Sequence, residues 1–469
     1  MLFTSIEFLF LFLPLALAGY YVLPSSGRRN ARNCWLLAAS LAFYAWGEPS
    51  FVMAMLASIA FNYAAALAID RLRGACPRAM RLALAAAVAG NLALLGTWKY
   101  CNFATAVLRE WLPSLQGAIA QTSFVLPIGI SFFTFQALSY IVDVSRGERA
   151  QRSPLRLALY IALFPQLVAG PIVRYTTVRD QLESRRETWE VFSRGVFRFV
   201  VGFNKKMLLA NALAEVADRA FASAPGSAAF AWLGAASYMF QIYFDFSGYS
   251  DMAIGLGGMF GFRFPENFDH PYVSKTVTEF WRRWHMSLGS WFRDYVYIPL
   301  GGSRVGRARL LANLAAVWLL TGLWHGAGWT FVLWGGLYGV LIAFEKLTGL
   351  AQKAERFRAL GAVCRPLTLL AVLLGWVLFR APSVGAALDH FAAMFGAAPL
   401  LDGPAVFWCR EMAVPLVCAA VGSAPVLGAR ILSGARTAAV GRALQFALFV
   451  VSVSCLVMNA HNPFIYFNF

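Results

Sequence analysis

The sequence predicts an all-α, polytopic membrane protein, and three features of the chain support that prediction. Hydrophobic residues make up 59% of the 469 residues and charged residues only 13%, a balance that excludes a soluble fold. Apolar runs recur along the whole chain, many near the roughly 20 residues that a helix needs to cross a bilayer. Basic segments separate these runs, as cytoplasmic loops do in membrane proteins.

The apolar runs set the expected number and order of the membrane spans. We expect roughly ten to twelve transmembrane helices, with further re-entrant or interfacial helices. The long runs lie near 6–23, 50–69, 81–98, 120–142, 228–246, 326–345, 411–428 and 443–460. Shorter or broken runs lie near 34–47, 155–170, 309–321 and 366–380. Pro127, Pro165 and Pro171 interrupt apolar runs, so we expect irregular backbone in the protein-lined interior.

The positive charges predict the orientation of the chain. The N-terminal run carries no basic residue before Arg28, so we interpret it as an uncleaved first span with its N-terminus outside. An outside N-terminus brings every strongly basic segment to the cytoplasm and leaves the C-terminus outside. Those segments are 28–32, 71–81, 146–156, 346–365 and 430–442.

Overall charge and cysteine content exclude several functions. The 40 Lys and Arg against 23 acidic residues give a formal charge of +17. In a membrane protein this excess reflects topology and anionic lipid headgroups, so we expect lipid contacts and no nucleic-acid partner. Seven scattered cysteines form no C-x-x-C pair, and neither a metal-ligand spacing nor a P-loop or G-x-G-x-x-G is present. We therefore predict no metal site.

The chain shows no repeat, low-complexity segment or linker, so we predict one membrane domain over residues 1–469. Polar residues concentrate between about 240 and 330, and we expect the catalytic core to cover about 240–345. Near 195–212, Lys205 and Lys206 interrupt an apolar helix, and we interpret that helix as interfacial.

The first candidate site is "GLWHGAGW", residues 322–329, which places His325 among glycines and tryptophans in an apolar region. Ionisable groups in membrane segments usually face a bundle interior or an aqueous cavity, where they function. The glycines allow close approach of a ligand or a backbone, and Trp324 and Trp329 supply apolar walls. A tight helix contact of the small-residue kind, with a structural histidine, is the alternative.

The second candidate site lies in residues 269–304, where His285 sits inside an aromatic stripe at helical spacing. The stripe is Phe280, Trp281, Trp284, Leu288, Trp291 and Tyr295. Arg282, Arg283 and Arg293 add positive charge, which suits either an interfacial helix or a docking surface for the phosphates of an anionic donor.

The remaining ionisable residues in apolar surroundings favour structural roles. Asp245 and Asp251 are expected to pair with nearby arginines or to cap a helix rather than to catalyse a reaction. His390, in a predicted outside loop, and His461, near the C-terminus, fit headgroup or structural roles. Taken alone, the residues leave two reactions open: acyl transfer with histidine as general base, and proton-coupled transport with histidine as relay.

Several motifs resemble the membrane-bound O-acyltransferase family. The run "FWRRWHMSLGSWFRDYVYIPLGG" is followed by "GLWHGAGWTFVLWGGLYG", and both match. Further matches are "DFSGYSDMAIG", "PENFDHPYVSKTVTEF", "LFTSIEFLFLFLPL" and "NPFIYFNF". The likeness is closest to the bacterial branch that O-acetylates alginate, with the D-alanyl transferases of teichoic acid as relatives.

The resemblance implies a ring of helices around a central tunnel with two catalytic histidines, His325 and His285. It also implies a cytoplasmic thioester donor, acetyl-CoA or another acyl thioester, with no bound cofactor. In this scheme His325 deprotonates the acceptor hydroxyl, and His285 orients that hydroxyl or stabilises the oxyanion, a contribution of about 3 kcal/mol per donor. Trp281, Trp284, Trp324 and Trp329 would line the site, and Arg282, Arg283 or Arg293 would hold donor phosphates.

The expected function is therefore O-acetylation of an exopolysaccharide, alginate first, at a bacterial inner membrane with both termini periplasmic. The resemblance implies periplasmic SGNH-type acetyltransferases and polysaccharide secretion machinery as partners. Cellulose, peptidoglycan and D-alanyl transfer are alternative chemistries for the same site. A proton-coupled transporter and a scaffold of the secretion complex are alternatives of other classes, and the transporter predicts charged residues spread over several spans.

Overall fold

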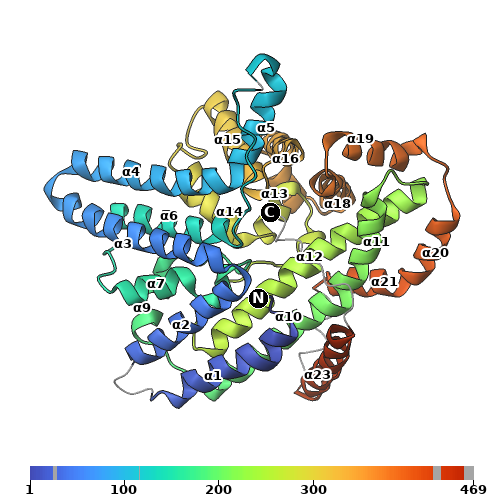
Figure 1. Ribbon diagram of the computed structural model, residues 1–469. Coiled ribbons are helices and arrows are strands. Elements are labelled where there is room, and N and C mark those ends of the chain that lie inside the picture. The colour runs from blue at the N-terminus through green and yellow to red at the C-terminus, as the bar shows by residue number, and fades with distance from the viewer. Residues whose placement is uncertain (25–28, 116, 426–434, 459–469) are drawn as a thin grey trace. The chain divides into compact units, whose positions relative to one another are not determined.

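The computed structural model describes residues 1–24, 29–115, 117–425 and 435–458, and within these ranges all regular structure is helical (Figure 1). This confirms the all-α prediction. His461, the closing motif at 462–469, and parts of the basic segments 28–32 and 430–442 lie outside the described residues.

The chain forms two compact units, Met1–Val196 with Ala253–Pro265, and Phe197–Met252 with Glu266–Phe469. Two of the three boundaries fall inside helices, since α10 (Trp189–Asn204) and α12 (Ala228–Met259) each contribute residues to both units, and the third lies between Pro265 and Glu266. The prediction of one domain over 1–469 stays a prediction. The expected core at 240–345 belongs to the second unit except for residues 253–265.

The first unit is built on a long helical hairpin, α3 with α4, and on further helices that precede and follow it in the chain (Figure 1). Its α-helices are α1 (Leu13–Val22), α2 (Arg29–Gly47), α3 (Val52–Ala75), α4 (Pro77–Leu95), α5 (Cys101–Trp111), α6 (Ile130–Arg146), α7 (Pro154–Ala162), α8 (Phe164–Leu167) and α9 (Tyr175–Glu183). Single turns η1 (Phe8–Phe12), η2 (Pro49–Phe51), η3 (Gly96–Tyr100) and η4 (Pro113–Leu115) adjoin them. Asn62 of α3 and Asn91 of α4 exchange side-chain hydrogen bonds of 3.0 and 2.8 Å, so polar groups join the two apolar helices of the hairpin.

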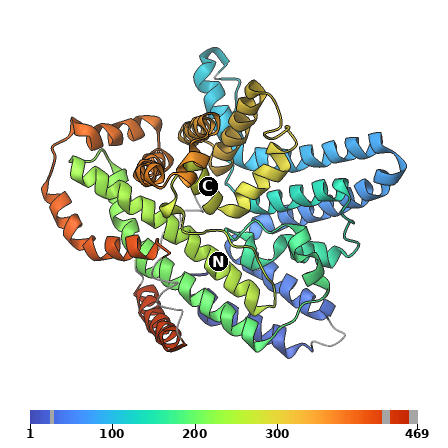
Figure 2. The same ribbon diagram turned by 180° about the vertical axis from the view of Figure 1, so that it is seen from behind.

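The second unit contains the aromatic core of the protein and the predicted site. Its α-helices, besides parts of α10 and α12, are α11 (Asn211–Ala222), α13 (Val277–Arg283), α14 (Met286–Phe292), α15 (Arg307–His325), α16 (Trp329–Thr348), α17 (Leu350–Arg356), α18 (Arg358–Arg380), α19 (Val384–Ala392), α20 (Gly403–Glu411), α21 (Ala413–Gly422) and α23 (Ala435–Val457). Short turns are η5 (Lys205–Ala210), η6 (Pro271–Val273), η7 (Arg293–Tyr297) and η8 (Ala393–Ala397). Seen from both sides, α19, α20 and α21 form an arc that returns to α11 (Figure 2).

Helices α15 and α16 pack closely because glycines remove side chains at their crossing. A Cβ on Gly322 would lie 2.3 Å from the carbonyl oxygen of Phe331, and one on Gly335 would lie 2.4 Å from that of Trp318. Real Cβ atoms do not approach backbone this closely, so Gly322 serves the small-residue helix contact that the sequence offered as an alternative.

Five helices in the described ranges are long and apolar enough to cross a membrane, and six if one bent pair counts as a span. They are Pro49–Ala75, Pro77–Trp111, Trp329–Thr348, Arg358–Arg380 and Ala439–Val457, and the bent pair is Gly403–Glu411 with Ala413–Gly422. Shorter apolar helices cover Phe8–Val22 and Val384–Ala397.

This count is below the ten to twelve expected, because several apolar runs do not form one long helix. The run at 120–142 is helical only from Ile130, after Gly129 in the left-handed conformation, and the run at 155–170 divides between α7 and α8 near Pro165. The polytopic helical class is confirmed, and the central tunnel stays a prediction.

Two local expectations were wrong. The aromatic stripe does not form one helix, because α13 ends at Arg283 and α14 begins only after His285. The helix around Lys206 is not simply interfacial, since the Lys206 ammonium is buried and lies 2.6 Å from a carboxylate oxygen of Asp245. A buried cation needs such a partner.

Candidate active site

His325 is the last residue of α15 and is only 3% exposed. Its ring meets three aromatic rings nearly edge to face, at centroid distances of 4.9 Å to Trp324, 5.1 Å to Trp334 and 5.2 Å to Phe379. The environment is therefore apolar on these sides.

His285 occupies the break between α13 and α14, with φ 45° and ψ 53°. The left-handed conformation is uncommon for a residue with a Cβ, and strain of this type concentrates at functional positions. Backbone hydrogen bonds hold the break: Asp269 donates to the carbonyl of Arg283 at 2.9 Å, and Met286 donates to the carbonyl of Asn267 at 2.9 Å.

A buried carboxylate from another helix anchors the start of α13. The two oxygens of Glu345, on α16, accept hydrogen bonds from the backbone N–H groups of Val277 at 2.7 Å and Thr278 at 2.8 Å. The Thr276 hydroxyl accepts from the N–H of Glu279 at 3.2 Å. These bonds satisfy N-terminal donors of α13 and complement its dipole, so the chain leading to His285 is tied to α16.

The two histidines share one neighbour. Trp324 contacts the ring of His325 and also that of His285, the latter at 5.8 Å between centroids, and Phe246 of α12 meets His285 edge on at 4.6 Å. His285 is 2% exposed and lies outside the candidate membrane spans. Burial lowers the pKa of His285 to about 3, so the imidazole is neutral at pH 7.

The other predicted tryptophans divide into two groups. Trp284 is buried and Trp281 half-buried, and both join the aromatic core, where Trp281 lies 5.3 Å from Trp334 and Trp284 lies 4.9 Å from Trp376. Trp329, the first residue of α16, is 42% exposed. The structure thus brings Trp324, rather than Trp329, against both histidines.

The predicted donor-binding arginines do not gather around the histidines. Arg283 pairs with Glu279 at 3.0 Å and with Asp269 at 2.9 Å. The exposed Arg293 pairs with Asp294 at 2.7 Å. Arg282 is exposed and makes no ion pair within the described residues, so of the three it has the most freely available guanidinium.

The acidic and remaining histidine candidates have structural positions. Asp251 pairs with Lys205 and Arg198, each at 2.6 Å, and Asp245 pairs with Lys206, as the expectation of ion pairing required. His390 is buried, which the prediction of an outside loop did not anticipate. Its ring stacks on Phe221 at 4.2 Å, and its Nε2 lies 3.1 Å from the carbonyl oxygen of Ala231.

Sequence reasoning missed Asn267, Phe246, Trp334 and Phe379, which contact the two histidines. Asn267 stands in the quoted motif "PENFDHPY", where a single asparagine in an aromatic stretch was the available signal. Nothing local to Phe246 or Phe379 distinguishes them from ordinary core residues.

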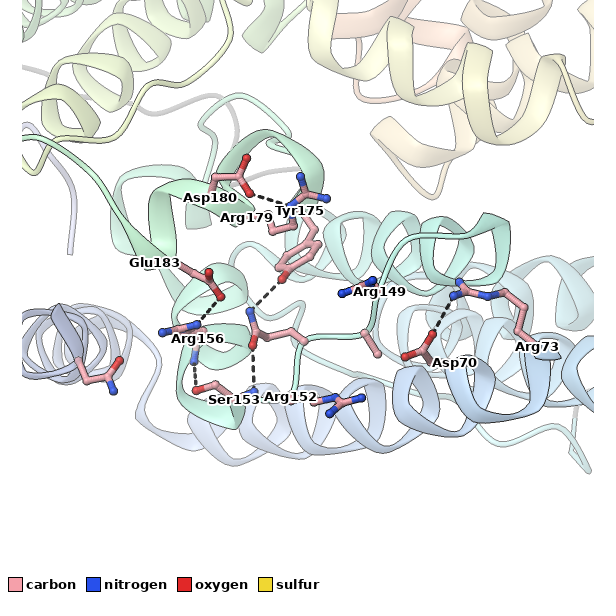
Figure 3. Close-up of a pocket in the computed structure, with 13 residues that line it drawn as sticks. Asp70, Arg73, Arg149, Arg152, Ser153, Arg156, Tyr175, Arg179, Asp180 and Glu183 are labelled. Carbon is pink, nitrogen blue, oxygen red and sulfur yellow. Dashed lines mark hydrogen bonds and ion pairs between the residues drawn. The ribbon is translucent and has the colours of Figure 1, made fainter. Parts of the chain in front are cut away.

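The first unit contains a polar pocket that holds none of the predicted site residues (Figure 3). Its volume is about 870 Å³. Its lining is Asn30, Asp70, Arg73, Arg149, Ala150, Gln151, Arg152, Ser153, Arg156, Tyr175, Arg179, Asp180 and Glu183. Carboxylates pair with three of the arginines, Arg73, Arg156 and Arg179. In the described part of the chain, no three His, Cys, Asp or Glu side chains gather closely enough to hold a metal ion.

Comparisons with known proteins agree with this architecture. The profile of the membrane-bound O-acyltransferase family matches residues 97–381. A protein of Pseudomonas putida named probable alginate O-acetylase AlgI is 41% identical over 502 aligned residues that cover 100% of both chains. One of the same name from Azotobacter vinelandii is 45% identical over 401 residues, 84% of this chain and 78% of that protein. The peptidoglycan O-acetyltransferase of Helicobacter pylori is 34% identical over 427 residues, 84% of this chain and 80% of that protein.

The chain belongs to the membrane-bound O-acyltransferase family. It is an O-acyltransferase and a multi-pass membrane protein.

Proposed function

We propose that the protein transfers acetyl groups from a cytoplasmic thioester toward an exopolysaccharide, alginate, at the bacterial inner membrane. The observation that carries the proposal is the end-to-end similarity to a probable alginate O-acetylase. Support at the site comes from two buried histidines that contact the same ring, Trp324. Peptidoglycan is the second candidate acceptor, because a peptidoglycan O-acetyltransferase aligns over 84% of this chain.

In the proposed reaction His325 takes the proton of the acceptor hydroxyl as that oxygen attacks the thioester carbonyl. A C–O bond forms, the C–S bond breaks when the tetrahedral intermediate collapses, and the proton passes from His325 to the departing sulfur. A hydroxyl has a pKa far above 7, so general-base catalysis of this kind is worth about 10²- to 10⁴-fold. His285 contacts the same substrate, and Trp281, Trp284 and Trp329 supply apolar surface near the path.

The donor is acetyl-CoA or another acyl thioester, and Arg282 is the best placed of the three arginines to bind its phosphates. The acetyl ester formed on that hydroxyl is then the donor for periplasmic SGNH-type acetyltransferases, which work with the polysaccharide secretion machinery and transfer the acetyl group to a hydroxyl of the polymer. Both termini face the periplasm in this arrangement, as the positive-inside rule requires. The catalytic core at about 240–345 acts within one membrane domain.

The test measures the O-acetyl content of secreted polymer in cells carrying His325→Ala or His285→Asn. Asparagine tolerates the left-handed backbone at position 285, so this variant removes the imidazole with little added strain. We expect acetylation to fall at least about 100-fold in each variant while polymer is still secreted.

His390→Ala is the matched control, because it removes another buried histidine of the same unit. It should keep acetylation, with membrane insertion of all variants checked by blotting. Persistent acetylation in both site variants would contradict the acyltransferase mechanism and favour transport or scaffolding.

A further inference from the structure

Asn267 makes four side-chain hydrogen bonds in the interior of the second unit. Its Oδ1 lies 3.2 Å from the backbone nitrogen of Ser287, 2.8 Å from the Ser287 hydroxyl and 3.1 Å from Nδ1 of His285. Its Nδ2 donates to the hydroxyl oxygen of Ser250, on α12, at 3.1 Å. The side chain is 1% exposed, so water does not compete for these bonds.

The backbone of Ser287 determines which way the amide of Asn267 points. A peptide N–H can only donate, so the side-chain atom that faces it must be the oxygen. In a flipped amide the Nδ2 donors of Asn267 would face the backbone N–H of Ser287, and two donors cannot bond each other. The oxygen of Asn267 therefore faces His285.

This orientation fixes the proton on the imidazole. Oδ1 of an amide carries no hydrogen, so the 3.1 Å bond exists only when Nδ1 of His285 is the donor. A bare Nδ1 could accept only from the Ser287 hydroxyl, at the longer distance of 3.5 Å, and would oppose the lone pairs of Oδ1. In the neutral ring a proton on Nδ1 leaves the lone pair on Nε2.

Nε2 of His285 is buried and makes no hydrogen bond with any described residue. The other described ring contacts of His285 are with Phe246 and Trp324, at centroid distances of 4.6 and 5.8 Å. A buried nitrogen with a lone pair and no protein partner is suited to a ligand that donates.

We propose that Asn267 is a positioning residue that holds His285 in the Nδ1–H tautomer, so that Nε2 accepts a hydrogen bond from a second hydroxyl of the acceptor substrate, next to the one that His325 deprotonates. The inference rests on the proposed function. It also separates the two roles open to His285: a bare Nε2 can orient a hydroxyl, whereas stabilising an oxyanion requires an N–H donor.

Two substitutions of Asn267 test the inference. Asn267→Leu removes the acceptor for Nδ1–H and frees the tautomer, and we expect acetyl transfer to fall by at least about tenfold, the loss typical of removing such a supporting hydrogen bond. Asn267→Asp keeps an acceptor for the same three donors, and the Ser250 hydroxyl can turn to donate. We expect Asn267→Asp to retain transfer at pH 8.

The dependence of acetyl transfer on pH distinguishes a positioning role of Asn267 from a purely structural one. A carboxylate next to His285 favours the imidazolium and raises its pKa, which in the natural protein is lowered by burial alone. The charged or titratable groups on α12, α13 and α15 and in the segment around Asn267 are Tyr238, Tyr243, Asp245, Tyr249, Asp251, Glu266, Asp269, His270, Glu279, Arg282, Arg283, Arg307, Arg309 and His325. Asn267→Asp should therefore lose activity between pH 8 and pH 6 to a larger degree than the natural protein does.

The assay measures acetyl transfer from radiolabelled acetyl-CoA in membrane vesicles with both faces at the buffer pH. In parallel, the O-acetyl content of the polymer is measured in cells carrying the same variants. Asn313→Leu is the matched control, since buried Asn313 only donates to the carbonyls of Leu300 and Gly302. It should leave the shape of the pH profile unchanged.

The outcomes distinguish a failure of the positioning role of Asn267 from a failure of the proposed acyltransferase function. Full acetylation in Asn267→Leu cells, or an Asn267→Asp profile in the vesicles that overlays the natural one, would overturn the positioning role while leaving the histidine mechanism in place. If the Asn267→Leu protein fails to insert into the membrane, the pH profile of Asn267→Asp alone decides whether Asn267 positions His285. Acetylation that survives His285→Asn and His325→Ala would instead overturn the proposed function itself.

Discussion

The arginine-rich pocket of the first unit and the histidine site of the second unit hold polar groups by opposite means. In the pocket, charged side chains lie near the surface and are neutralised by carboxylates, as in the pair of Arg156 with Glu183. At the site, the neutral ring of His285 is enclosed by aromatic side chains, and its Nδ1 is held by the side chain of Asn267. The first arrangement tolerates the loss of a partner because water replaces it, and the second does not.

The largest effect should come from the glycine contact beside His325. Gly322→Ala would press a methyl group against the Phe331 carbonyl, 2.3 Å away, so α15 and α16 must separate. We expect a loss of about 1–3 kcal/mol in stability, as for overpacked cores, and reduced acetyl transfer. The matched variant is Gly336→Ala on α16, where nothing lies within 4 Å of the new methyl group. Thermal melting in detergent should show Gly336→Ala unchanged or stabilised, and equal melting of the two variants would contradict the close-packing argument.

The next effect compares a buried carboxylate of the second unit with an exposed one of the first. Glu345→Ala removes the carboxylate that accepts from the N–H groups of Val277 and Thr278, and loss of such a helix cap costs about 0.5–2 kcal/mol. Glu183→Ala, where the side chain is 56% exposed, should cost at most about 1 kcal/mol. Denaturation in detergent measures both, and a larger loss in Glu183→Ala would reverse the comparison.

The third effect comes from the titration of His285, which is small near neutral pH and grows as the pH falls. Burial lowers the pKa of His285 to about 3, while the unfolded chain titrates near about 6.5, so the unfolded state binds more protons between these values. The free energy of unfolding therefore has its full value above about pH 6.5. It decreases as the pH falls toward 3, by at most about 1.4 kcal/mol for each pH unit. Melting temperatures from pH 7 to pH 4.5 should therefore fall more steeply for the natural protein than for His285→Asn. Parallel curves would mean that position 285 is not the titrating group.

The smallest effects belong to the unpaired arginines of the pocket. Arg149 and Arg152 are exposed and make no side-chain hydrogen bond or ion pair within the described residues. Arg149→Ala and Arg152→Ala should each change stability by less than about 0.5 kcal/mol and leave acetyl transfer intact. Melting and polymer acetylation measured together check this, and a strong loss of either would give the pocket a part in the reaction.

The amino-acid sequence by itself determined the helical membrane class and the family resemblance, and it singled out His325 and His285 as the candidate catalytic residues. These conclusions depend on composition, on apolar runs and on motifs contiguous in the chain, and these features can be identified without knowledge of the tertiary structure. The chain breaks near Pro127 and Pro165 were equally local, because proline removes a backbone donor wherever it stands.

Only the tertiary structure decided what surrounds the histidines. Asn267 reaches His285 across 18 positions, and Glu345 caps α13 from a helix 67 and 68 positions away from its bonded N–H groups. The break of the aromatic stripe at His285 depends on the same long-range bonds, since helical spacing alone favours continuing the helix. Contacts of this kind are set by packing between elements distant in the chain, and the side chains that make them look like ordinary core residues until the helices meet.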